Sequence, residues 1–431
     1  MLTRELLAKQ IFSKKDDVQD WFLQRSRQAP PPFYSSIDLR DSGFKVAPVD
    51  CNLYPAGFNN ICSADLENAP EIFRNNVEYQ LGKLKLNSVN KVLIIPESNT
   101  QNTFYVENLM YLSEILKNGG FDVRIGWYHP ELQNSQGCQT ITLQSHSGKT
   151  LEAHSIQFNS SGEGELLCGE FRPDWILLNN DFSSGYPLHF DTVSQPFLPS
   201  HSLGWHTREK GKHFDFYNSL CVDFSKLINV DPRMIQITTE TVEPVDFNEN
   251  QGIEAIAHAV ERVLEKTREF YKDHNIQASP YVFVKSNVGT YGMGVMTVRS
   301  PEELLQLNRR KKNKMSVGKN RIPIRSVVVQ EGVPTETIVD EIAAEPVIYL
   351  SGCTLIGGFL RTNPASDRLG NLNSKGMVFR KLCMADLQKL LEVSVSGEAD
   401  YKAILLEATY GAIARLSSLA AGQELKAAEV P

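Results

Sequence analysis

Residues 281–298 read Tyr281-Val282-Phe283-Val284-Lys285-Ser286-Asn287-Val288-Gly289-Thr290-Tyr291-Gly292-Met293-Gly294-Val295-Met296-Thr297-Val298. Two apolar runs flank a loop that carries three glycines between positions 289 and 294. Glycine has no Cβ, so its backbone N–H groups can come close to phosphate oxygens. Lys285, on the first apolar run, would add a positive point charge for the same phosphates. We therefore expect the loop 289–294 and Lys285 to bind the phosphates of a nucleotide.

The order of elements around this loop separates it from two common nucleotide-binding motifs. In Rossmann and P-loop folds, a strand, a glycine loop and a helix follow one another. Here the chain continues after the loop as an apolar strand, 294–298. A helix begins only at Ser300, with Pro301 in its first turn and Glu303 completing a capping box. This order predicts a β-hairpin whose tip folds over a nucleotide; the alternative is a plain hairpin turn with surplus glycines.

A second phosphate-loop candidate is excluded by its spacing. Residues 147–150 read Ser147-Gly148-Lys149-Thr150, like the end of a P-loop. Leu143 stands where the first glycine of that motif belongs, and no strong strand-to-helix context surrounds the segment. We expect no phosphate binding there.

The residues after the hairpin supply candidates for the rest of a nucleotide and for a metal ion. The apolar strand 326–331 leads into Gln330, Glu331 and Val333, where backbone groups and a carboxylate could hold adenine and ribose. Acidic residues that follow could hold Mg²⁺ near a triphosphate, because this ion prefers oxygen ligands. They are Glu336, Asp340, Glu341 and Glu345. The alternative for each acid is a solvated strand face.

An arginine and an asparagine-rich turn come next along the chain. Arg361, at the end of a predicted strand 355–360, could hold a carboxylate or phosphate with two parallel hydrogen bonds. Asn371 and Asn373, in the stretch 370–376, could offer amide oxygens to a metal ion. Asn and Gly also favour ordinary turns, which is the alternative for this segment.

The overall composition is that of a soluble globular protein and limits which classes of function are expected. The chain has 431 residues, 41% hydrophobic and 22% charged, with a net charge of -7. An extended nucleic-acid surface and a membrane span are therefore not expected, and neither is a secretory signal. Seven cysteines without Cys-x-x-Cys spacing favour free thiols in a reducing cytoplasm over structural zinc or a disulfide framework.

The remaining pattern predicts an α/β (α+β) fold in two or three parts. The first 30 residues indicate helix, and 33–60 is extended and turn-rich. Residues 91–127 and the strand 175–178 indicate β-α-β units of a parallel sheet. An amphipathic helix, 253–274, and an alanine-rich C-terminal helix complete the pattern. We divide the chain into an N-terminal segment 1–90, a parallel-sheet substrate subdomain 91–200 and a nucleotide-binding region 201–431.

Taken together, these features resemble the ATP-grasp superfamily. More closely, the chain is similar to the bacterial glutamate–cysteine ligases that are related to eukaryotic-type glutathione synthetase. The resemblance covers nearly the whole chain. Besides the glycine loop, its most specific motifs are 34–40 (YSSIDLR), 47–55 (APVDCNLYP), 57–60 (GFNN), 96–100 (PESNT) and 203–208 (LGWHTR).

The resemblance implies a set of roles for residues of this chain. Related synthetases carry an acidic-x-Asn metal motif early in the chain, and Asp50 and Asn52 are similar, with Asp in place of Glu. Arg208 and Lys210 are then expected to reach the nucleotide, with Lys285, Arg361 and Arg40 as the catalytic residues. Candidates for holding the amino-acid substrates are Ser35, Ser36, Arg40, Asn59, Asn60, Glu97, Asn99 and Arg361. Candidates for holding Mg²⁺ are Asp50, Asn52, Glu345, Asn371 and Asn373.

The implied reaction is the ATP-dependent joining of glutamate and cysteine in the cytoplasm. ATP phosphorylates the γ-carboxylate of glutamate, the cysteine amine attacks the acyl phosphate, and phosphate leaves. Glutathione synthetase or another ATP-dependent ligase is the nearest alternative. Two alternatives of another class are a nucleotide sensor without chemistry and a nucleic-acid-binding protein, the latter prompted by the basic run 309–314. That run lacks interleaved aromatic residues, which favours a solvated helix end.

Overall fold

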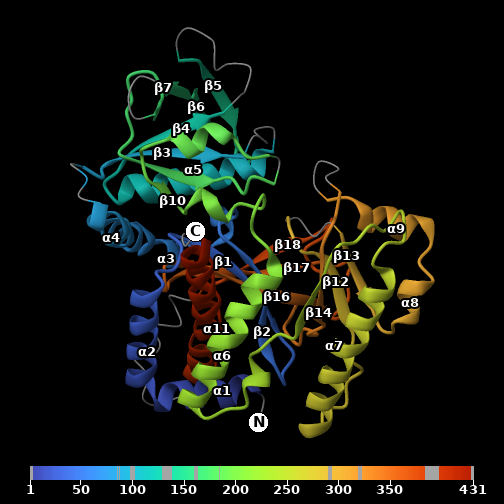
Figure 1. Cartoon of the computed structure of the whole chain (residues 1–431). Helices are drawn as coiled ribbons and strands as arrows, with labels where there is room; N and C mark the ends of the chain where they lie inside the picture. Colours follow the sequence, from blue (N-terminus) through green and yellow to red (C-terminus); the bar gives the residue numbers. More distant parts are fainter. Residues whose placement is uncertain are drawn as a thin grey trace.

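The computed structural model describes residues 3–84, 86, 88–97, 102–128, 138–159, 164–183, 185–289, 294–318, 323–383 and 398–428. Five residues of the expected sites lie outside the described residues: Asn99, Thr290, Tyr291, Gly292 and Met293. The described chain forms three large sheets with helices packed against them, as Figure 1 shows. The expected α/β (α+β) fold is confirmed.

The central sheet joins the N-terminal part of the chain to its C-terminal part. Its strands are antiparallel, in the order β18-β17-β16-β1-β2, and β15 pairs with β16. The bounds are β1 (Ser35–Asp41), β2 (Val46–Asn52), β15 (Ile338–Val339), β16 (Ile342–Ser351), β17 (Thr354–Thr362) and β18 (Val378–Leu382). Sequence patterns had indicated only extended chain for β1 and β2 and had not predicted β16.

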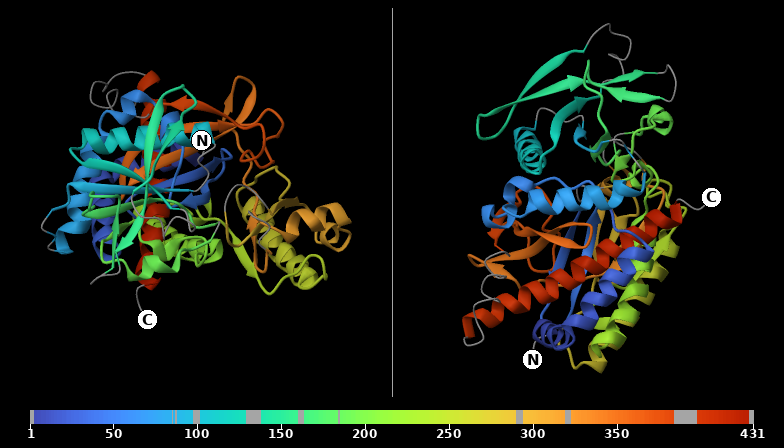
Figure 2. Two further views of the ribbon diagram at one scale, coloured as in Figure 1. Left: turned by 90° about the horizontal axis from the view of Figure 1, so that it is seen from above. Right: turned by 90° about the vertical axis from the view of Figure 1, so that its left-hand side faces the viewer.

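One face of the central sheet is apolar because alternate side chains of a strand point to opposite faces. Ile37 and Leu39 of β1 and Ile348 of β16 are fully buried in one core with four helices. These helices are α1 (Thr3–Ser13), α2 (Lys15–Gln28), α6 (Lys210–Ile228) and α11 (Glu398–Ala428). Figure 2 shows the long α11 crossing this side of the molecule beside α1, α2 and α6. The opposite face is polar around Asp38, Arg40 and Glu345, where it belongs to the site described below. Further along, Val347, Tyr349 and Phe359 make this face apolar, and they are buried in a second core.

The second sheet contains the predicted β-α-β unit. Its order is β10-β9-β3-β4-β6-β5; all neighbours are parallel except β5, which pairs antiparallel with β6. Its strands are β3 (Lys91–Pro96), β4 (Asp122–Trp127), β5 (Thr140–Gln144), β6 (Thr150–Ser155), β9 (Trp175–Asn179) and β10 (Phe197–Leu198). The P-loop-like residues 147–150 lie at the β5–β6 hairpin turn, without a following helix.

The helices of this part are α5 (Thr103–Asn118) and α4 (Ala69–Leu81), which share a buried core with the sheet. The remaining short elements connect the larger ones. They are α3 (Ser63–Leu66), η1 (Phe58–Asn60), η2 (Gly82–Leu84), β7 (Gln157–Asn159), β8 (Glu165–Leu167), η4 (Leu188–Thr192), η5 (His201–Leu203) and η6 (Pro232–Met234).

The third sheet contains the predicted glycine-loop hairpin. Its antiparallel order is β11-β14-β12-β13, from β11 (Thr239–Val242), β12 (Val282–Ser286), β13 (Val295–Val298) and β14 (Val327–Glu331). The amphipathic helix α7 (Ile253–Asp273) buries its apolar side against one face. Two short helices follow β13, α8 (Glu302–Leu305) and α9 (Arg309–Ser316). The order strand, loop, strand, helix is therefore confirmed.

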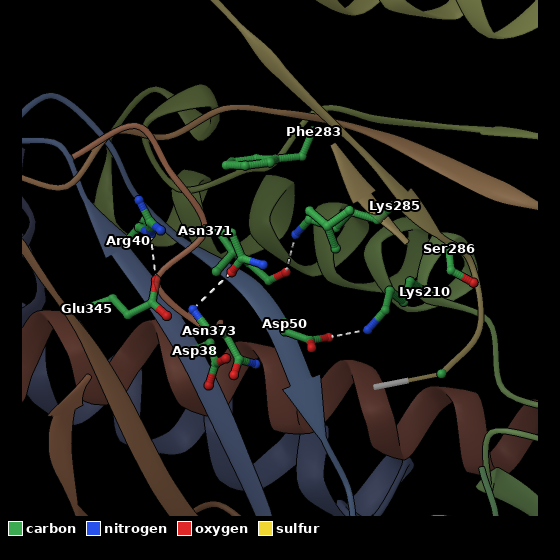
Figure 3. A pocket seen from close by; sticks show the side chains of 13 residues that line it. Asp38, Arg40, Asp50, Lys210, Phe283, Lys285, Ser286, Glu345, Asn371 and Asn373 are labelled. Carbon is green, nitrogen blue, oxygen red and sulfur yellow. Dashed lines mark hydrogen bonds and ion pairs between the residues drawn. The ribbon is translucent and has the colours of Figure 1, made fainter. Parts of the chain in front are cut away.

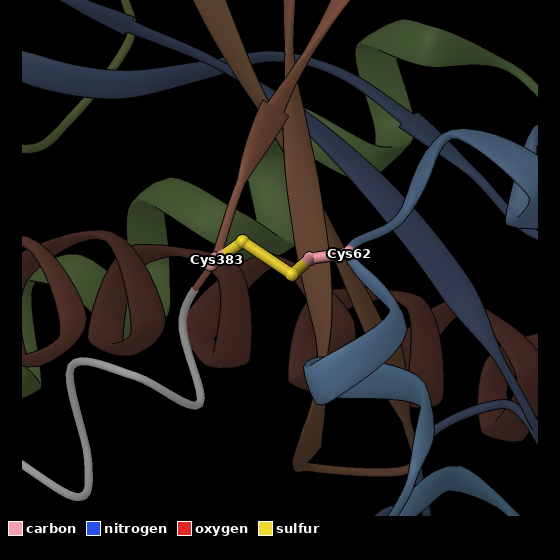
Figure 4. The surroundings of a disulfide bond; sticks show 2 residues. All are labelled: Cys62 and Cys383. Atoms are coloured by element: carbon pink, nitrogen blue, oxygen red, sulfur yellow. A yellow bond between two sulfur atoms is a disulfide. The ribbon is translucent and has the colours of Figure 1, made fainter.

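One pair of cysteines corrects an expectation. Cys62, just before α3, and Cys383, after β18, form a disulfide with a Cα–Cα distance of 5.3 Å (Figure 4). The expectation of free thiols throughout is wrong for this pair. The two cysteines are 321 residues apart, so sequence spacing carries no sign of their contact. None of the described helices has the length and apolarity needed to cross a membrane.

Candidate active site

A cleft lies between the polar face of the central sheet and the β12–β13 hairpin of the third sheet (Figure 3). Its walls come from segments of the sequence that are far apart. The lining residues are Asp38, Arg40, Val49, Asp50, Lys210, Phe283, Lys285, Ser286, Gly289, Val295, Glu345, Asn371 and Asn373. The structure thus brings together eight of the expected site residues: Arg40, Asp50, Lys210, Lys285, Gly289, Glu345, Asn371 and Asn373.

Strand register explains the floor of the cleft. Asp38 and Arg40 alternate along β1 with the buried Ile37 and Leu39, so they point to the polar face. Asp50 of β2 lies directly opposite Asp38. Residues opposite one another in an antiparallel pair share a face. The central sheet therefore gathers carboxylates and a guanidinium on the side that faces the hairpin.

Buried ion pairs connect the charges of the floor. Arg361 of β17 lies opposite Glu345 of β16; its Nη1 donates to Glu345 Oε1 at 2.7 Å and to Asp38 Oδ2 at 2.6 Å. Arg40 Nε donates to Glu345 Oε2 at 2.7 Å, and its Nη2 donates to the carbonyl oxygen of Gly370 at 2.7 Å. Arg361 itself is not part of the cleft lining. It lies directly behind the lining residues and holds two of them.

The balance of burial and charge sets the pKa of each carboxyl group. Burial raises the pKa of Asp38 more than Arg361 lowers it. Burial also raises the pKa of Glu345, but Arg40 and Arg361 together bring it below its usual value. For Asp50, burial is outweighed by Lys210 and Lys285, and its pKa falls to about 2. Asp50 and Glu345 are thus ionised in the cleft at neutral pH.

The opposite wall comes from alternate residues of β12. Phe283 and Lys285 point into the cleft, while Val282 and Val284 pack in the core with α7. Lys285 Nζ donates to the carbonyl oxygen of Val49 at 3.1 Å and to Gln330 Oε1 at 2.5 Å. Burial lowers the pKa of Lys285 to about 8.

The second lysine of the cleft is held in place at the start of α6. Lys210 Nζ donates to Asp50 Oδ1 at 2.6 Å. The fully buried Asn287, just after β12, accepts from Lys210 N at 2.8 Å through its carbonyl oxygen and from Gly211 N at 2.9 Å through Oδ1. This contact brings the start of α6 beside the end of β12. The two lysines therefore face Asp50 from two different elements.

The three residues that were predicted to hold the nucleotide at the end of β14 lie in three different surroundings. Gln330 lies opposite Phe283 and shares its face of the sheet. Glu331 lies on the other face, where its carboxylate pairs with Lys45, so the structure does not bring it to the cleft. Val333 is buried in the core of the central sheet and its helices.

Arg208 lies under the cleft rather than in it. Its Nε donates to Glu424 Oε2 of α11 at 2.8 Å, and its Nη1 donates to the carbonyl oxygen of Cys51 at 2.5 Å. The guanidinium therefore supports β2 next to Asp50, from the helix side of the sheet. It has no position among the cleft residues from which to reach a nucleotide directly.

Apart from Arg40 and Arg361, the described residues expected to hold amino acids lie on β1, in η1 and after β3. Ser36 lies opposite Asn52, which had been expected to hold Mg²⁺ with Asp50, while the Oγ of Ser35 lies 3.4 Å from Ser418 Oγ of α11. Asn59 and Asn60 form η1, and Glu97 follows β3, where its backbone N donates to Tyr105 Oη. None of these residues is among the described residues that line the cleft.

Sequence reasoning missed several lining residues, of which Asp38 and Phe283 carry the most chemistry. Both could have been predicted from the alternation of side chains along a strand. Asp38 stands between Ser36 and Arg40 in a strand with period two, and Phe283 stands two residues before Lys285. Once β1 and β12 are known as strands, each must share the face of its neighbours two positions away.

The oxygen atoms of the cleft suit a magnesium ion. Asp38, Asp50 and Glu345 offer carboxylates, and Asn371 and Asn373 carry amide oxygens. Among the described residues, no three His, Cys, Asp or Glu side chains are close enough to hold a metal ion by themselves. In nucleotide sites, Mg²⁺ is held by one or two carboxylates together with substrate phosphates and water. Asp50 and Glu345 are the residues that would hold it.

The β12–β13 hairpin faces a floor of carboxylates and Arg40, and Lys210 and Lys285 lie in the same cleft. Cations set against carboxylates in one cleft are the groups that an ATP-dependent ligase needs for phosphoryl transfer. Comparison with known proteins makes the assignment specific. The family described as glutamate-cysteine ligase, GshA, matches residues 8–425. The chain belongs to this family, as its sequence motifs had indicated.

A solved structure is similar to this chain over nearly its whole length. A protein of Methylobacillus flagellatus KT, described as a "putative gamma-glutamylcysteine synthetase", is 33% identical and superposes with a TM-score of 0.85. The alignment covers 98% of this chain and 96% of that one. A glutathione synthetase-like effector of Globodera pallida, in its apo form, aligns over 85% of this chain and 84% of its own, with 10% identity and a TM-score of 0.39, too low to carry an argument. No match was found among curated proteins.

Proposed function

We propose that the cleft is where ATP, glutamate and cysteine meet to form γ-glutamylcysteine. The observation that carries the proposal is the convergence of Lys210, Lys285 and Arg40 on the carboxylates of Asp50 and Glu345. These residues come from four different segments of the chain. Cations that stabilise a transferred phosphoryl group and carboxylates that hold its metal ion are the two requirements of phosphoryl transfer.

We place the phosphates of ATP against Lys285 and Lys210, beside Gly289. Both lysines are already oriented by Asp50 or by acceptors from neighbouring strands, so they need little rearrangement to stabilise charge on the γ-phosphoryl group. Asp50 and Glu345 would hold Mg²⁺, with Asn371 and Asn373 as further oxygen donors. The ion, when bound, neutralises phosphate charge.

Glutamate is placed over the floor beside Arg40 and Arg361. Arg40 lines the cleft and can meet a carboxylate of glutamate directly, whereas Arg361 lies behind the lining and orients Asp38 and Glu345. A γ-carboxylate oxygen of glutamate attacks the γ-phosphorus of ATP, the bond to the leaving oxygen of ADP breaks, and γ-glutamyl phosphate forms. The cysteine amine then attacks the acyl carbon, loses a proton, and phosphate departs.

The experiment follows ADP release by purified enzyme with ATP, Mg²⁺, glutamate and cysteine. Lys285→Met should lower kcat at least about 100-fold, because it removes a charge that stabilises the transition state. Lys266→Met, an exposed lysine on α7, is the matched control and should keep wild-type turnover. Wild-type turnover by Lys285→Met would show that the reaction does not take place in this cleft. Turnover with γ-glutamylcysteine and glycine, but not with glutamate and cysteine, would assign the second step of glutathione synthesis instead.

A further inference from the structure

Asn287 is fully buried directly after β12 and holds the chain at the start of α6. Its carbonyl oxygen accepts from Lys210 N at 2.8 Å, and its Oδ1 accepts from Gly211 N at 2.9 Å. Its Nδ2 donates to Glu209 Oε2 at 3.1 Å. Asn287 therefore binds Lys210 and the residues on both sides of it.

Asn287 is itself fixed to Ser326, the residue before β14. Its backbone N donates to the carbonyl oxygen of Ser326 at 3.0 Å, and Nδ2 donates to Ser326 Oγ at 3.0 Å. An amide side chain has two N–H donors and an acceptor oxygen, and here each of these groups has a partner. Turning the buried amide would leave polar groups without partners, which is costly. The side chain therefore has one favoured orientation.

The contact also depends on the glycine that follows Lys210. A Cβ on Gly211 would lie 2.1 Å from Thr241 Oγ1 of β11 and 3.4 Å from Asn287 Oδ1. Atoms that are 2.1 Å apart overlap, so only glycine lets the first turn of α6 come this close to the third sheet. A glycine and a buried amide thus meet where Lys210 joins the sheet.

The position of Lys210 matters because it faces Asp50 together with Lys285. Lys210 Nζ donates to Asp50 Oδ1 at 2.6 Å, and Lys285 enters the same cleft from β12 (Figure 3). A lysine has a flexible stem, so the place that its ammonium group reaches depends on where its backbone is held. Asn287 follows Lys285 by two residues. The segment that carries one lysine therefore holds the backbone of the other.

We propose that Asn287 is a positioning residue, which holds Lys210 at the distance from Lys285 where both ammonium groups act on one phosphoryl group. The inference rests on the proposed function, which places the phosphates of ATP against these lysines. Asn287 is not among the described residues that line the cleft, so it acts through Lys210 rather than on a substrate. A misplacement of about 1 Å can lower the rate of a reaction about 100-fold.

The test measures ADP release with ATP, Mg²⁺, glutamate and cysteine. Asn287→Ala removes the side-chain hydrogen bonds that hold the residues beside Lys210 and should lower kcat by about 10- to 100-fold. KM for glutamate and for cysteine should stay within about twofold of wild type, because neither amino acid is placed at Lys210.

Asn218→Ala is the matched control. Asn218 lies on the same helix, and its side chain binds the carbonyl oxygen and the N–H of Ile237, at 2.8 and 3.0 Å. Both variants should lower the midpoint of urea unfolding, but Asn218→Ala should keep wild-type kcat. Wild-type kcat in Asn287→Ala, or an equal loss of kcat in the two variants, would overturn the proposal.

A double-mutant cycle separates positioning from a general loss of structure. If Asn287 acts through Lys210, then Asn287→Ala should lower kcat by less than about threefold in the Lys210→Met background. A further loss as large as the one in the wild-type background would show that Asn287 does not act through Lys210.

Exchanging donor and acceptor gives a second measurement that preserves the size of both side chains. Asn287→Asp replaces Nδ2 by an oxygen that faces the Glu209 carboxylate, so kcat should fall. Adding Glu209→Gln restores a donor–acceptor pair and the original net charge, and kcat should recover by about tenfold. Unchanged kcat in Asn287→Asp, or no recovery in the double variant, would contradict the positioning role.

Lys210→Met and Lys285→Met distinguish this inference from the proposed function. Lost turnover in both, with wild-type kcat in Asn287→Ala, would overturn only the positioning role of Asn287. Wild-type turnover in both lysine variants would overturn the placement of ATP in the cleft.

Discussion

Replacing Glu424 by Gln tests whether the buried network under the cleft stabilises the fold. Glu424 Oε2 accepts from Arg208 Nε at 2.8 Å, Oε1 accepts from Arg208 Nη2 at 3.1 Å, and Oε1 also pairs with His213 Nδ1. The side chains of Arg208, Glu424 and His213 are at most 5% exposed. Glutamine keeps the size of the side chain but leaves two buried cations without a counter-charge.

The magnitude can be derived in two ways. Removing one partner of a buried ion pair costs about 3–5 kcal/mol. Burial raises the pKa of Glu424, but Arg208 and His213 lower it from 4.5 to about 2, a change that corresponds to about 3 kcal/mol of stability. The two values agree, so we expect Glu424→Gln to lower the free energy of unfolding by about 3–4 kcal/mol.

The free energy of unfolding that Glu424→Gln loses should depend on pH in a definite direction. The lowered pKa of Glu424 contributes stability above pH 4.5, which is lost as pH falls through about 2. Burial lowers the pKa of His213, but Cys51 and Glu424 raise it from 6.5 to about 9. Its contribution is therefore complete below pH 6.5 and is lost as pH rises through 9. The deficit of the variant should be largest between about pH 5 and 6.5 and smaller at pH 9.

The assay is urea unfolding followed by circular dichroism at pH 6 and at pH 9. Glu261→Gln is the control, because Glu261 pairs with Arg268 at 2.8 Å on the surface, where the two side chains are 39% and 49% exposed. Its loss should be below about 1 kcal/mol at both pH values. Equal losses for the two variants, or a deficit of Glu424→Gln that is larger at pH 9 than at pH 6, would refute the reasoning.

Three further predictions concern the cleft. Because the pKa of Lys285 is lowered to about 8, kcat/KM for ATP should fall up to about tenfold per pH unit above pH 8; a flat profile to pH 9.5 would contradict this charge assignment. Asp50→Asn should raise the Mg²⁺ concentration for half-maximal turnover by about tenfold or more, whereas an unchanged Mg²⁺ titration would remove Asp50 as a ligand. Gly332→Ala should lower stability by about 1–3 kcal/mol through collision with Tyr281, measured by urea unfolding, and combining it with Tyr281→Ala should recover part of the loss.

The local chemistry of the hairpin could be predicted from sequence because its signal is local. Glycines, a lysine and the order of the following elements all lie within 25 residues, and the structure reproduces them as β12, β13 and a later helix. Asp50 and Lys210 were identified through motifs that resemble a family, and the structure brings both to the same cleft. Local patterns and motif resemblance therefore predicted these residues of the cleft lining.

The pairing of distant strands could not be predicted in the same way. β1 lies between β2 and β16, so residues 35–38 pair with residues about 310 positions away. Alternation indicates which side chains share a face, but it contains no information about the partner strand. For this reason Glu345 was expected to be a solvated acid or a metal ligand, and its burial between Arg40 and Arg361 was not foreseen. The disulfide from Cys62 to Cys383 was missed for the same reason.

The charges of the cleft explain why a metal ion is expected to accompany the nucleotide. Among the described residues that line it, three carboxylates, Asp38, Asp50 and Glu345, face three cations, Arg40, Lys210 and Lys285. The formal charges of these lining groups thus balance before ATP binds, and a triphosphate brings several negative charges into a buried space. When ATP binds, Lys210 and Lys285 turn from Asp50 and its neighbours to the phosphate oxygens. The carboxylates then lose their counter-charges, and an unpaired buried charge is costly. A divalent cation between carboxylate and phosphate restores the balance on both sides.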